Sequence, residues 1–261
     1  MTQVAAAQLR SEQAGAESVR TVQEGMSLLG QAQRAHEAGE IAVRRLEPAN
    51  LRAFPLLSKH APERYLQEFR QLRSRLQRVR VLREAHGQKT RSILVTSPQP
   101  GEGKSFVALN LALMIAVAPE ARILLADLNV RRPTFQSRFK LPKGPGLEEI
   151  IAGAAWRQAS WWMPDTQLYI TTLSDSPRDL MDPLHYDKLA ARVEALSADF
   201  DWIIFDGPAL LEGPDAEIAS VLADATLLVV RRGETSFAEM DECTHRIAPG
   251  RLAGVVYNSA R

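Results

Sequence analysis

The chain has 261 residues, 45% of them hydrophobic, and a formal net charge of +1. This length and composition fit one large α/β domain, with or without an appendage, and the near-neutral charge gives no general argument for binding nucleic acid or a membrane surface. A single cysteine, Cys243, excludes a disulfide framework and fits a reducing cytoplasm.

The first 50 residues are expected to form an N-terminal extension, and residues 51–261 the folded domain. Residues 1–45 are rich in Ala, Gln, Glu and Arg without a strong apolar period, so we expect them to be partly helical or disordered and to pack poorly. A long helix with one apolar stripe is predicted over residues 63–85. Its many arginines favour a solvated face, because the interleaved aromatics typical of nucleic-acid binding are lacking.

The most informative motif follows this helix. An apolar run at residues 93–95 leads into the turn Thr-Ser-Pro-Gln-Pro-Gly-Glu-Gly-Lys-Ser at 96–105, and a helix is predicted over residues 106–113. A strand, a glycine-rich turn and a helix in this order predict a phosphate-binding loop, whose backbone N–H groups and helix N-terminus bind phosphate oxygens. Lys104 is expected to reach the β- and γ-phosphates, and Ser105 to bind Mg²⁺. A proline at 98, where the strict pattern has its first glycine, leaves a chance glycine-rich turn as the alternative.

Apolar runs then alternate with helical patterns. Strands are predicted at residues 122–126, 168–173, 202–205, 226–230 and 254–257. Helices are predicted at residues 147–152, 183–198, 215–222 and 237–247. Near-continuous apolar strands separated by helices are typical of an α/β fold with a mostly parallel sheet and helices on both faces. Residues 134–182, with three tryptophans, give no clear pattern.

Two of the predicted strands end in an acid, Asp127 and Asp206. Ligands collect at the carboxyl ends of strands in an open parallel sheet, so both acids are expected at the same rim as the loop. There a carboxylate can hold Mg²⁺ and can orient or deprotonate an attacking hydroxyl, whereas a lone aspartate at a strand end more often caps a turn. Arg131 and Arg132 follow the first acid and either neutralise phosphate, bridge to a neighbouring subunit or stay solvated.

Taken together, these motifs resemble the bacterial tyrosine kinases (BY-kinases) of capsule and exopolysaccharide systems. Residues 96–105 are similar to the Walker A motif of that family, 124–133 to its Walker A′ motif and 203–208 to its Walker B motif. The resemblance extends from about residue 64 to the C-terminus. It implies a P-loop NTPase fold of the deviant Walker A type that binds ATP with Mg²⁺ and transfers the γ-phosphate to tyrosine.

The resemblance also implies roles for individual residues. The catalytic residues would be Lys104, Asp127 and Asp206, and the metal ligands Ser105, Asp127 and Asp206. The cofactor-binding residues would be Pro100, Gly101, Glu102, Gly103, Lys104, Ser105, Phe106, Arg131 and Asn258, the last near the adenine. The family works beside a membrane co-polymerase of the chain-length-determinant type and controls polymer synthesis or export. No apolar run approaches the ~18 residues of a membrane-spanning helix and no secretory segment opens the chain, so we expect a soluble protein at the inner membrane through that partner.

Four departures from the family pattern bear on activity. Asn129 replaces the second acid of Walker A′ and brings neither charge nor base. The chain has no C-terminal tyrosine cluster, so phosphorylation of its own tail is not expected. Gln67, Arg70 and Arg73 fall where the family has Glu-x-x-Arg-x-x-Arg in its ring-forming helix, so a cyclic assembly is in question. Walker B is followed by a single proline instead of two.

Four functions remain open. The favoured one is a kinase-like ATPase of a polysaccharide assembly system, with kinase activity reduced or lost. The others are a tyrosine kinase acting in trans, a non-enzymatic adaptor that keeps its nucleotide, and a partitioning-type ATPase. The last group uses a second lysine where this chain has Gln99, so nucleic acid is disfavoured as a partner, whereas a homo-oligomer stays among the alternatives.

Overall fold

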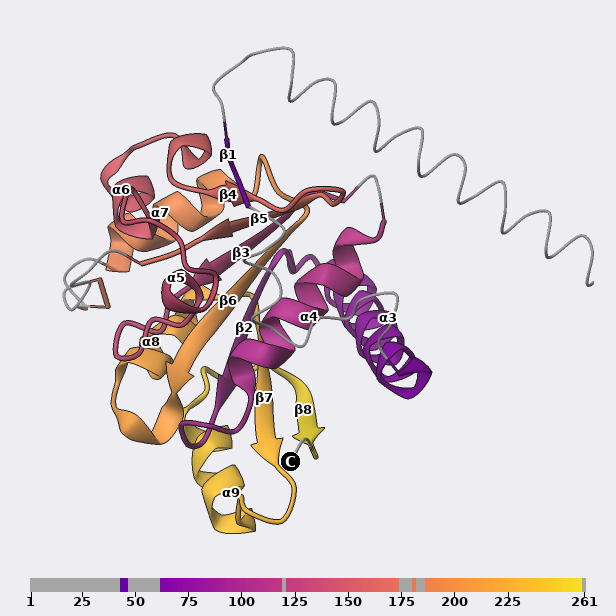
Figure 1. Ribbon diagram of the computed structural model, residues 1–261. Helices are drawn as coiled ribbons and strands as arrows, with labels where there is room; N and C mark the ends of the chain where they lie inside the picture. The colour runs from indigo at the N-terminus through magenta and orange to yellow at the C-terminus, as the bar shows by residue number, and fades with distance from the viewer. Residues whose placement is uncertain (1–42, 47–61, 119–120, 174–179, 182–185, 260–261) are drawn as a thin grey trace, which may run out of the picture.

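The computed structural model describes residues 43–46, 62–118, 121–173, 180–181 and 186–259. This part of the chain folds around an eight-stranded sheet with the strand order β1-β4-β5-β3-β6-β2-β7-β8 (Figure 1). The strands are β1 (Arg44–Arg45), β2 (Ser92–Ser97), β3 (Ile123–Asp127), β4 (Trp161–Trp162), β5 (Leu168–Thr171), β6 (Trp202–Ala209), β7 (Ala225–Arg231) and β8 (Leu252–Asn258). All neighbouring strands are parallel except β4 and β5, which confirms the predicted mostly parallel sheet.

Helices cover both faces of the sheet (Figure 1). One face carries α3 (Glu63–Ala85) and α4 (Lys104–Ala116), and the other carries α6 (Leu147–Ala152), α7 (Tyr186–Leu196), α8 (Asp215–Leu222) and α9 (Phe237–Arg246). Successive strand residues point to opposite faces. Leu125 accordingly packs in the core under α4, while its neighbour Leu124 packs in the core under α7. Because both faces are covered, the central strands are apolar throughout, which produced the continuous runs in the sequence.

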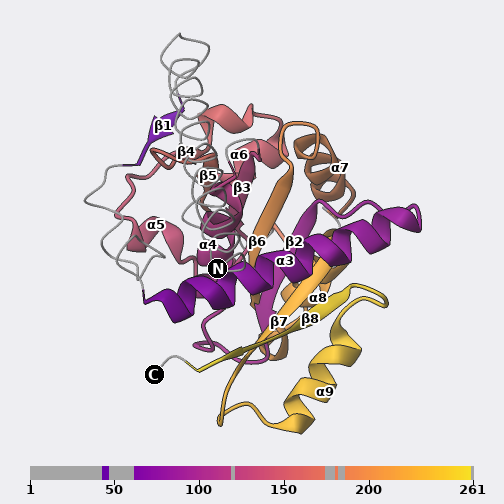
Figure 2. The same cartoon turned by 90° about the vertical axis from the view of Figure 1, so that its right-hand side faces the viewer.

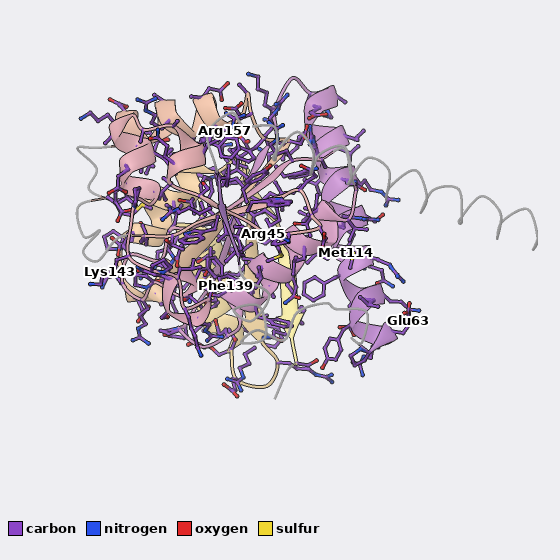
Figure 3. The ribbon with its side chains drawn as sticks, turned by 45° about the horizontal axis from the view of Figure 1, so that its top comes forward. Arg45, Glu63, Met114, Phe139, Lys143 and Arg157 are labelled. Carbon is purple, nitrogen blue, oxygen red and sulfur yellow. The ribbon has the colours of Figure 1, made fainter. Side chains whose placement is uncertain are left out.

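The helix α3 lies outermost on its face and crosses the sheet over α4 (Figure 2). Phe69 of α3 meets Phe106 of α4 edge to face, with ring centroids 6.0 Å apart. Arg73 donates a hydrogen bond to the backbone carbonyl oxygen of Met114, 3.1 Å away. Figure 3 shows Met114 on the side of α4 that faces α3, and Glu63 at the outer end of α3. None of the described helices is both long and apolar enough to cross a membrane.

Most predicted elements are present. Helices at 63–85, 147–152 and 215–222 have the predicted bounds, and the loop helix α4 is longer than predicted at both ends. The predicted helix 183–198 is α7, which ends at Leu196, two residues earlier than predicted; residues 183–185 lie outside the described chain. The four-residue helix α5 (Phe135–Arg138) falls in the segment that gave no clear pattern.

The expectation of poor packing is wrong for the end of segment 1–45. Arg44–Arg45 forms the edge strand β1, parallel to Trp161–Trp162, and the next residue, Leu46, is completely buried. The Arg44 guanidinium lies over the Trp161 ring, 4.3 Å from its centroid. A two-residue strand is too short to show an alternating pattern, and here the arginines pack through cation–π contacts instead of an apolar stripe. The domain boundary at residue 50 stays a prediction, but the sheet includes a strand before it.

Candidate functional site

The chain leaves β2 at the rim of the sheet, turns through the phosphate-binding loop and enters α4. Gly101 and Gly103 have positive φ angles of 87° and 96°, which favour glycine. A Cβ on Gly103 would lie 2.1 Å from the side-chain nitrogen of Asn258, so a larger residue does not fit there. That nitrogen donates a hydrogen bond to the Glu102 carbonyl oxygen over 2.8 Å. The last strand of the sheet therefore braces the backbone of the loop.

A pocket of about 550 Å³ opens beside this loop. Its lining residues are Pro100, Gly101, Gly103, Lys104, Ser105, Phe106, Asn129, Arg132, Pro133, Thr134, Ser137, Arg138, Arg231 and Asn258. The helix α4 presents its N-terminus here, where unpaired N–H groups and the helix dipole attract anions. With Lys104 and three arginines in the same wall, the pocket has the charge to hold a polyphosphate.

Most of the predicted cofactor-binding residues line this pocket, but two do not. Glu102 is buried in the loop and directs its carboxylate away from the pocket, toward the backbone of Gln99 and the hydroxyl of Thr235. Arg131 forms an ion pair of 2.5 Å with Asp215 at the start of α8 and lines a neighbouring pocket instead. Of the two adjacent arginines, only Arg132 lines the phosphate pocket, so the cofactor role of Arg131 stays a prediction.

The two acids lie side by side, although β6 continues to Ala209, so that Asp206 lies within this strand and not at the predicted end. Asp127 and Asp206 are register partners on the adjacent strands β3 and β6, and both are fully buried. Asp127 accepts three backbone N–H bonds: from Asn129 over 3.0 Å, from Thr134 over 2.8 Å and from Phe135 over 3.2 Å. The Asp127 carboxylate therefore stabilises the backbone of the loop that runs from β3 to the first residue of α5.

Asp206 differs from Asp127 in the hydrogen bonds that its carboxylate makes. Neither of its carboxylate oxygens has a hydrogen-bond partner among the described residues. Burial and the charge of Asp127 raise the pKa of Asp206 above the usual carboxyl range, while the nearby Ser105 hydroxyl, whose hydrogen bond goes to the Thr134 hydroxyl over 3.5 Å, and the positive charges of Lys104 and Arg138 act in the other direction. Burial also raises the pKa of Asp127, against the three backbone bonds that lower it. Because burying a carboxylate without a hydrogen-bond partner is costly, such a group is expected where a cation binds.

The donor set fits Mg²⁺ in particular. A hydroxyl from Ser105 and carboxylate oxygens are hard ligands of the kind Mg²⁺ prefers. Among the described residues there is no cluster of three or more His, Cys, Asp or Glu side chains that could hold a metal on its own. A site with few protein ligands, completed by phosphate oxygens and water, is the usual arrangement for this ion.

Asn129 is nearly buried at the pocket wall, where its side-chain oxygen accepts the Arg132 backbone N–H over 3.3 Å. The Asn129 amide therefore stabilises the turn, a role that a carboxylate could also fill.

Gln99 donates its side-chain N–H to Glu239 of α9 over 3.1 Å. Partitioning-type ATPases use a lysine at this position.

The structure adds pocket residues that the sequence did not assign. Arg138 comes from α5 and Arg231 from the end of β7, more than 90 residues apart in sequence. Arg231 also forms an ion pair of 3.1 Å with Glu234. Only the strand order brings these arginines to the loop, and no spacing in the sequence signals their meeting.

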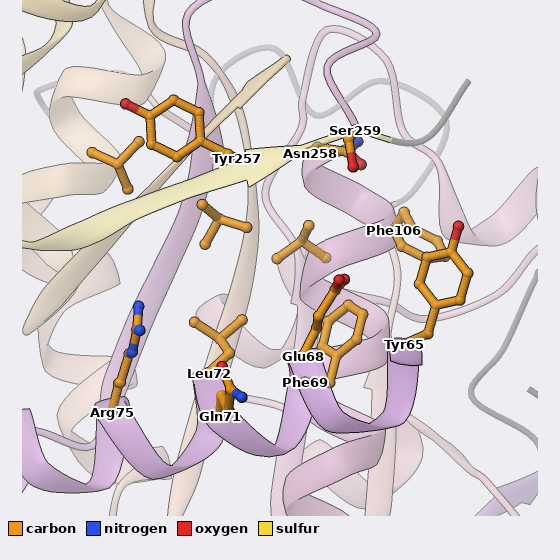
Figure 4. A pocket seen from close by; sticks show the side chains of 13 residues that line it. Tyr65, Glu68, Phe69, Gln71, Leu72, Arg75, Phe106, Tyr257, Asn258 and Ser259 are labelled. Atoms are coloured by element: carbon orange, nitrogen blue, oxygen red, sulfur yellow. The ribbon is translucent and has the colours of Figure 1, made fainter. Parts of the chain in front are cut away.

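A second pocket of about 250 Å³ adjoins the first between α3, α4 and β8 (Figure 4). It shares Phe106 and Asn258 with the phosphate pocket. Figure 4 shows Tyr65, Phe69 and Phe106 gathered near Asn258 at one end. The aromatic and amide groups of this pocket suit a flat, heterocyclic ring.

Comparisons with known proteins bear on this site. The chain is 30% identical over 177 residues to the tyrosine-protein kinase YwqD of Bacillus subtilis (strain 168), covering 66% of this chain and 73% of that protein. It is 29% identical over 178 residues to the succinoglycan biosynthesis transport protein ExoP of Rhizobium meliloti (strain 1021), covering 66% of this chain but only 22% of that protein. No protein-family model matches the chain. The solved BceF tyrosine kinase domain superposes with a TM-score of 0.67 at 24% identity, covering 89% of this chain and 98% of that domain, which shows a common fold.

Proposed function

This chain belongs to the family of bacterial tyrosine-protein kinases, and we propose that it binds ATP with Mg²⁺ at the phosphate-binding loop and acts as a kinase-like ATPase. The observation that carries the proposal is the unpartnered, fully buried carboxylate of Asp206 close to Lys104 and Ser105. Folding an unpartnered charge into a protein is costly, so this group is best explained by a cation that pairs with it.

Each residue of the site has a distinct proposed task. Lys104 neutralises charge on the γ-phosphate, with Arg132, Arg138 and Arg231 placed to add positive charge in the same pocket. Ser105 and Asp206 hold Mg²⁺, which when bound would neutralise charge on the phosphate oxygens. Asn258 and Phe106 lie beside the adenine, in the smaller pocket that adjoins the phosphate pocket.

Asp127 is the proposed second acid of the metal site and the candidate base. Its three backbone bonds hold the carboxylate in a single orientation next to Asp206. A fixed, buried carboxylate with a raised pKa is suited to accept a proton from an attacking hydroxyl. Arg131 then acts indirectly, through its ion pair with Asp215.

The biological setting is the second part of the proposal. ExoP is named for succinoglycan biosynthesis, and the resemblance to capsule and exopolysaccharide kinases implies a membrane partner of the chain-length-determinant type. We infer that this chain regulates the polymerisation or export of such a polymer from the cytoplasmic face of the inner membrane. Since the chain matches only about a fifth of ExoP, the remainder of that protein has no counterpart in this alignment.

A tyrosine kinase acting in trans is the second candidate, because Lys104, Asp127 and Asp206 are all present. The partitioning-type alternative is disfavoured, since Gln99 is bonded to Glu239 within the same subunit and carries no positive charge.

The test is γ-phosphate release from ATP and Mg²⁺ by the full chain, alone and with the cytoplasmic segments of a candidate chain-length partner. We expect release to appear or rise with the partner and to vanish in Lys104→Ala. Lys89→Ala is the matched control, because Lys89 is an exposed lysine paired with Glu194 far from the loop. Phosphotyrosine on the partner would identify a trans kinase, and tight binding without turnover an adaptor. An absence of nucleotide binding by the wild type would refute the proposal.

A further inference from the structure

Glu102 is a buried acid inside the phosphate-binding loop, only 4% exposed. An acid beside a phosphate site would repel the ligand if it faced the pocket. Instead, one carboxylate oxygen accepts the backbone N–H of Gln99 over 2.9 Å, and the other accepts the hydroxyl of Thr235. Both carboxylate oxygens of Glu102 therefore accept hydrogen bonds, and the side chain stabilises the conformation of the loop.

Thr235 links this acid to the far wall of the pocket. Its hydroxyl oxygen also accepts the backbone N–H of Arg231 over 2.9 Å, and the Arg231 side chain lines the phosphate pocket. A hydroxyl has one proton to donate and lone pairs to accept, so one side chain holds Glu102 and Arg231 at once.

A second contact runs parallel to the first. Gln99 donates its side-chain N–H to Glu239 over 3.1 Å. Glu239 in turn forms a capping box with Ser236, the N-cap residue of α9. The loop is thus tied to the start of α9 at two points, through Gln99 before Gly101 and Glu102 after it.

We propose that the hydrogen bond between Thr235 and Glu102 is a positioning device that holds the phosphate-binding loop in its ligand-ready shape by anchoring it to α9. Gly101 and Gly103 give the loop unusual conformational freedom, so its N–H groups converge on a phosphate only if something else restrains the backbone. Glu102 supplies this restraint by closing the turn on Gln99, and Thr235 holds Glu102. The inference rests on the proposed nucleotide binding and makes Glu102 and Thr235 positioning residues.

The experiment measures the dissociation constant of ADP with Mg²⁺ by titration calorimetry. Thr235→Val removes the hydroxyl while keeping the shape of the side chain. We expect the affinity for ADP to fall about tenfold, because one oxygen of the buried Glu102 carboxylate loses its donor. Thr235→Ser keeps the hydroxyl and is expected to stay within about twofold of the wild type. Thr244→Val is the matched control, since Thr244 lies on α9 and its hydroxyl bonds to the Asp241 carbonyl oxygen of the same helix, away from the loop. If Thr235→Val does not fold, Thr235→Ala replaces it.

A double-mutant cycle separates positioning from a general effect on stability. Glu102→Gln is expected to weaken ADP binding on its own, and adding Thr235→Val is expected to cause a smaller loss than it causes in the wild type, because the contact that the two residues share is lost only once. The inference would be overturned if the two substitutions acted independently, so that their fold losses in ADP affinity multiplied in the double variant. It would also be overturned if Thr235→Val bound ADP as tightly as the wild type does. A wild type that binds no ADP overturns the proposed function first and this inference with it.

Discussion

Asp206→Asn is expected to stabilise the protein in the absence of ligand while abolishing its response to ATP and Mg²⁺. The carboxylate is fully buried without a hydrogen-bond partner and faces a second buried acid. Removing this charge removes its desolvation cost and its repulsion of Asp127, and the new amide can donate to the Asp127 carboxylate. After relaxation an unpaired buried charge costs several kcal/mol, of which we expect about 2 kcal/mol to be recovered.

The pH dependence follows from the direction of the shift. The pKa of Asp206 is raised in the folded state, so the folded protein binds more protons than the unfolded chain once the pH exceeds the ordinary carboxyl pKa of about 4. Wild-type stability therefore falls as the pH rises from about 4 toward the raised pKa. Asp206→Asn lacks this loss, so its advantage is small at pH 4.5 and grows toward pH 8.

The assay is a thermal melt of both proteins at pH 4.5 and pH 8, with and without ATP and Mg²⁺. At pH 8 without ligand we expect the variant to melt about 5 °C higher, and only the wild type to gain stability from the ligand. Asp165→Asn is the matched control, because Asp165 is an exposed acid in a left-handed turn that asparagine tolerates. A variant that melts below the wild type at pH 8 would show that Asp206 already has a stabilising partner, and would refute the reasoning.

Three further predictions concern neighbouring groups. Asp127→Ala leaves three backbone N–H groups without an acceptor, and should lower the free energy of unfolding by about 2 kcal/mol in urea titrations, even after the relief of repulsion at Asp206; an unchanged midpoint would contradict this. Asn129→Asp should raise γ-phosphate release about tenfold if the missing carboxylate is what weakens the site, and equal rates would place any defect elsewhere. Burial raises the pKa of Cys243 to about 12, so a thiol reagent at pH 8 should label it only in denaturant, and rapid labelling of the native protein would disprove its burial.

The core of the site was predictable because its residues follow a local rule. The phosphate-binding loop follows β2 and Asp127 ends β3, while Asp206 follows the apolar run of β6, three residues before that strand ends, and parallel strands bring these positions to one rim. The helices near 63–85 and 215–222 were predictable because their signals are local; the first of them has its own apolar stripe and a glycine just after its end.

What escaped prediction depends on contacts between distant segments. Arg131 and Arg132 are adjacent in sequence, yet Arg131 pairs with Asp215 in the neighbouring pocket while Arg132 lines the phosphate pocket. The inward-facing Glu102 needs Thr235, which is 133 residues away. The edge strand Arg44–Arg45 is held by tryptophan rings that no local pattern pairs with it.

The bracing of the loop by Asn258 has a consequence for the order in which the protein matures. Residues 96–105 leave the ribosome roughly 150 residues before Asn258 does, which at typical synthesis rates is a delay of about 10–30 s. During that interval the loop lacks the contact that supports its backbone at Glu102. The phosphate pocket is thus completed by one of the last strands to be made, so the proposed nucleotide binding, measured on a nascent chain, would report that the sheet has closed as far as β8.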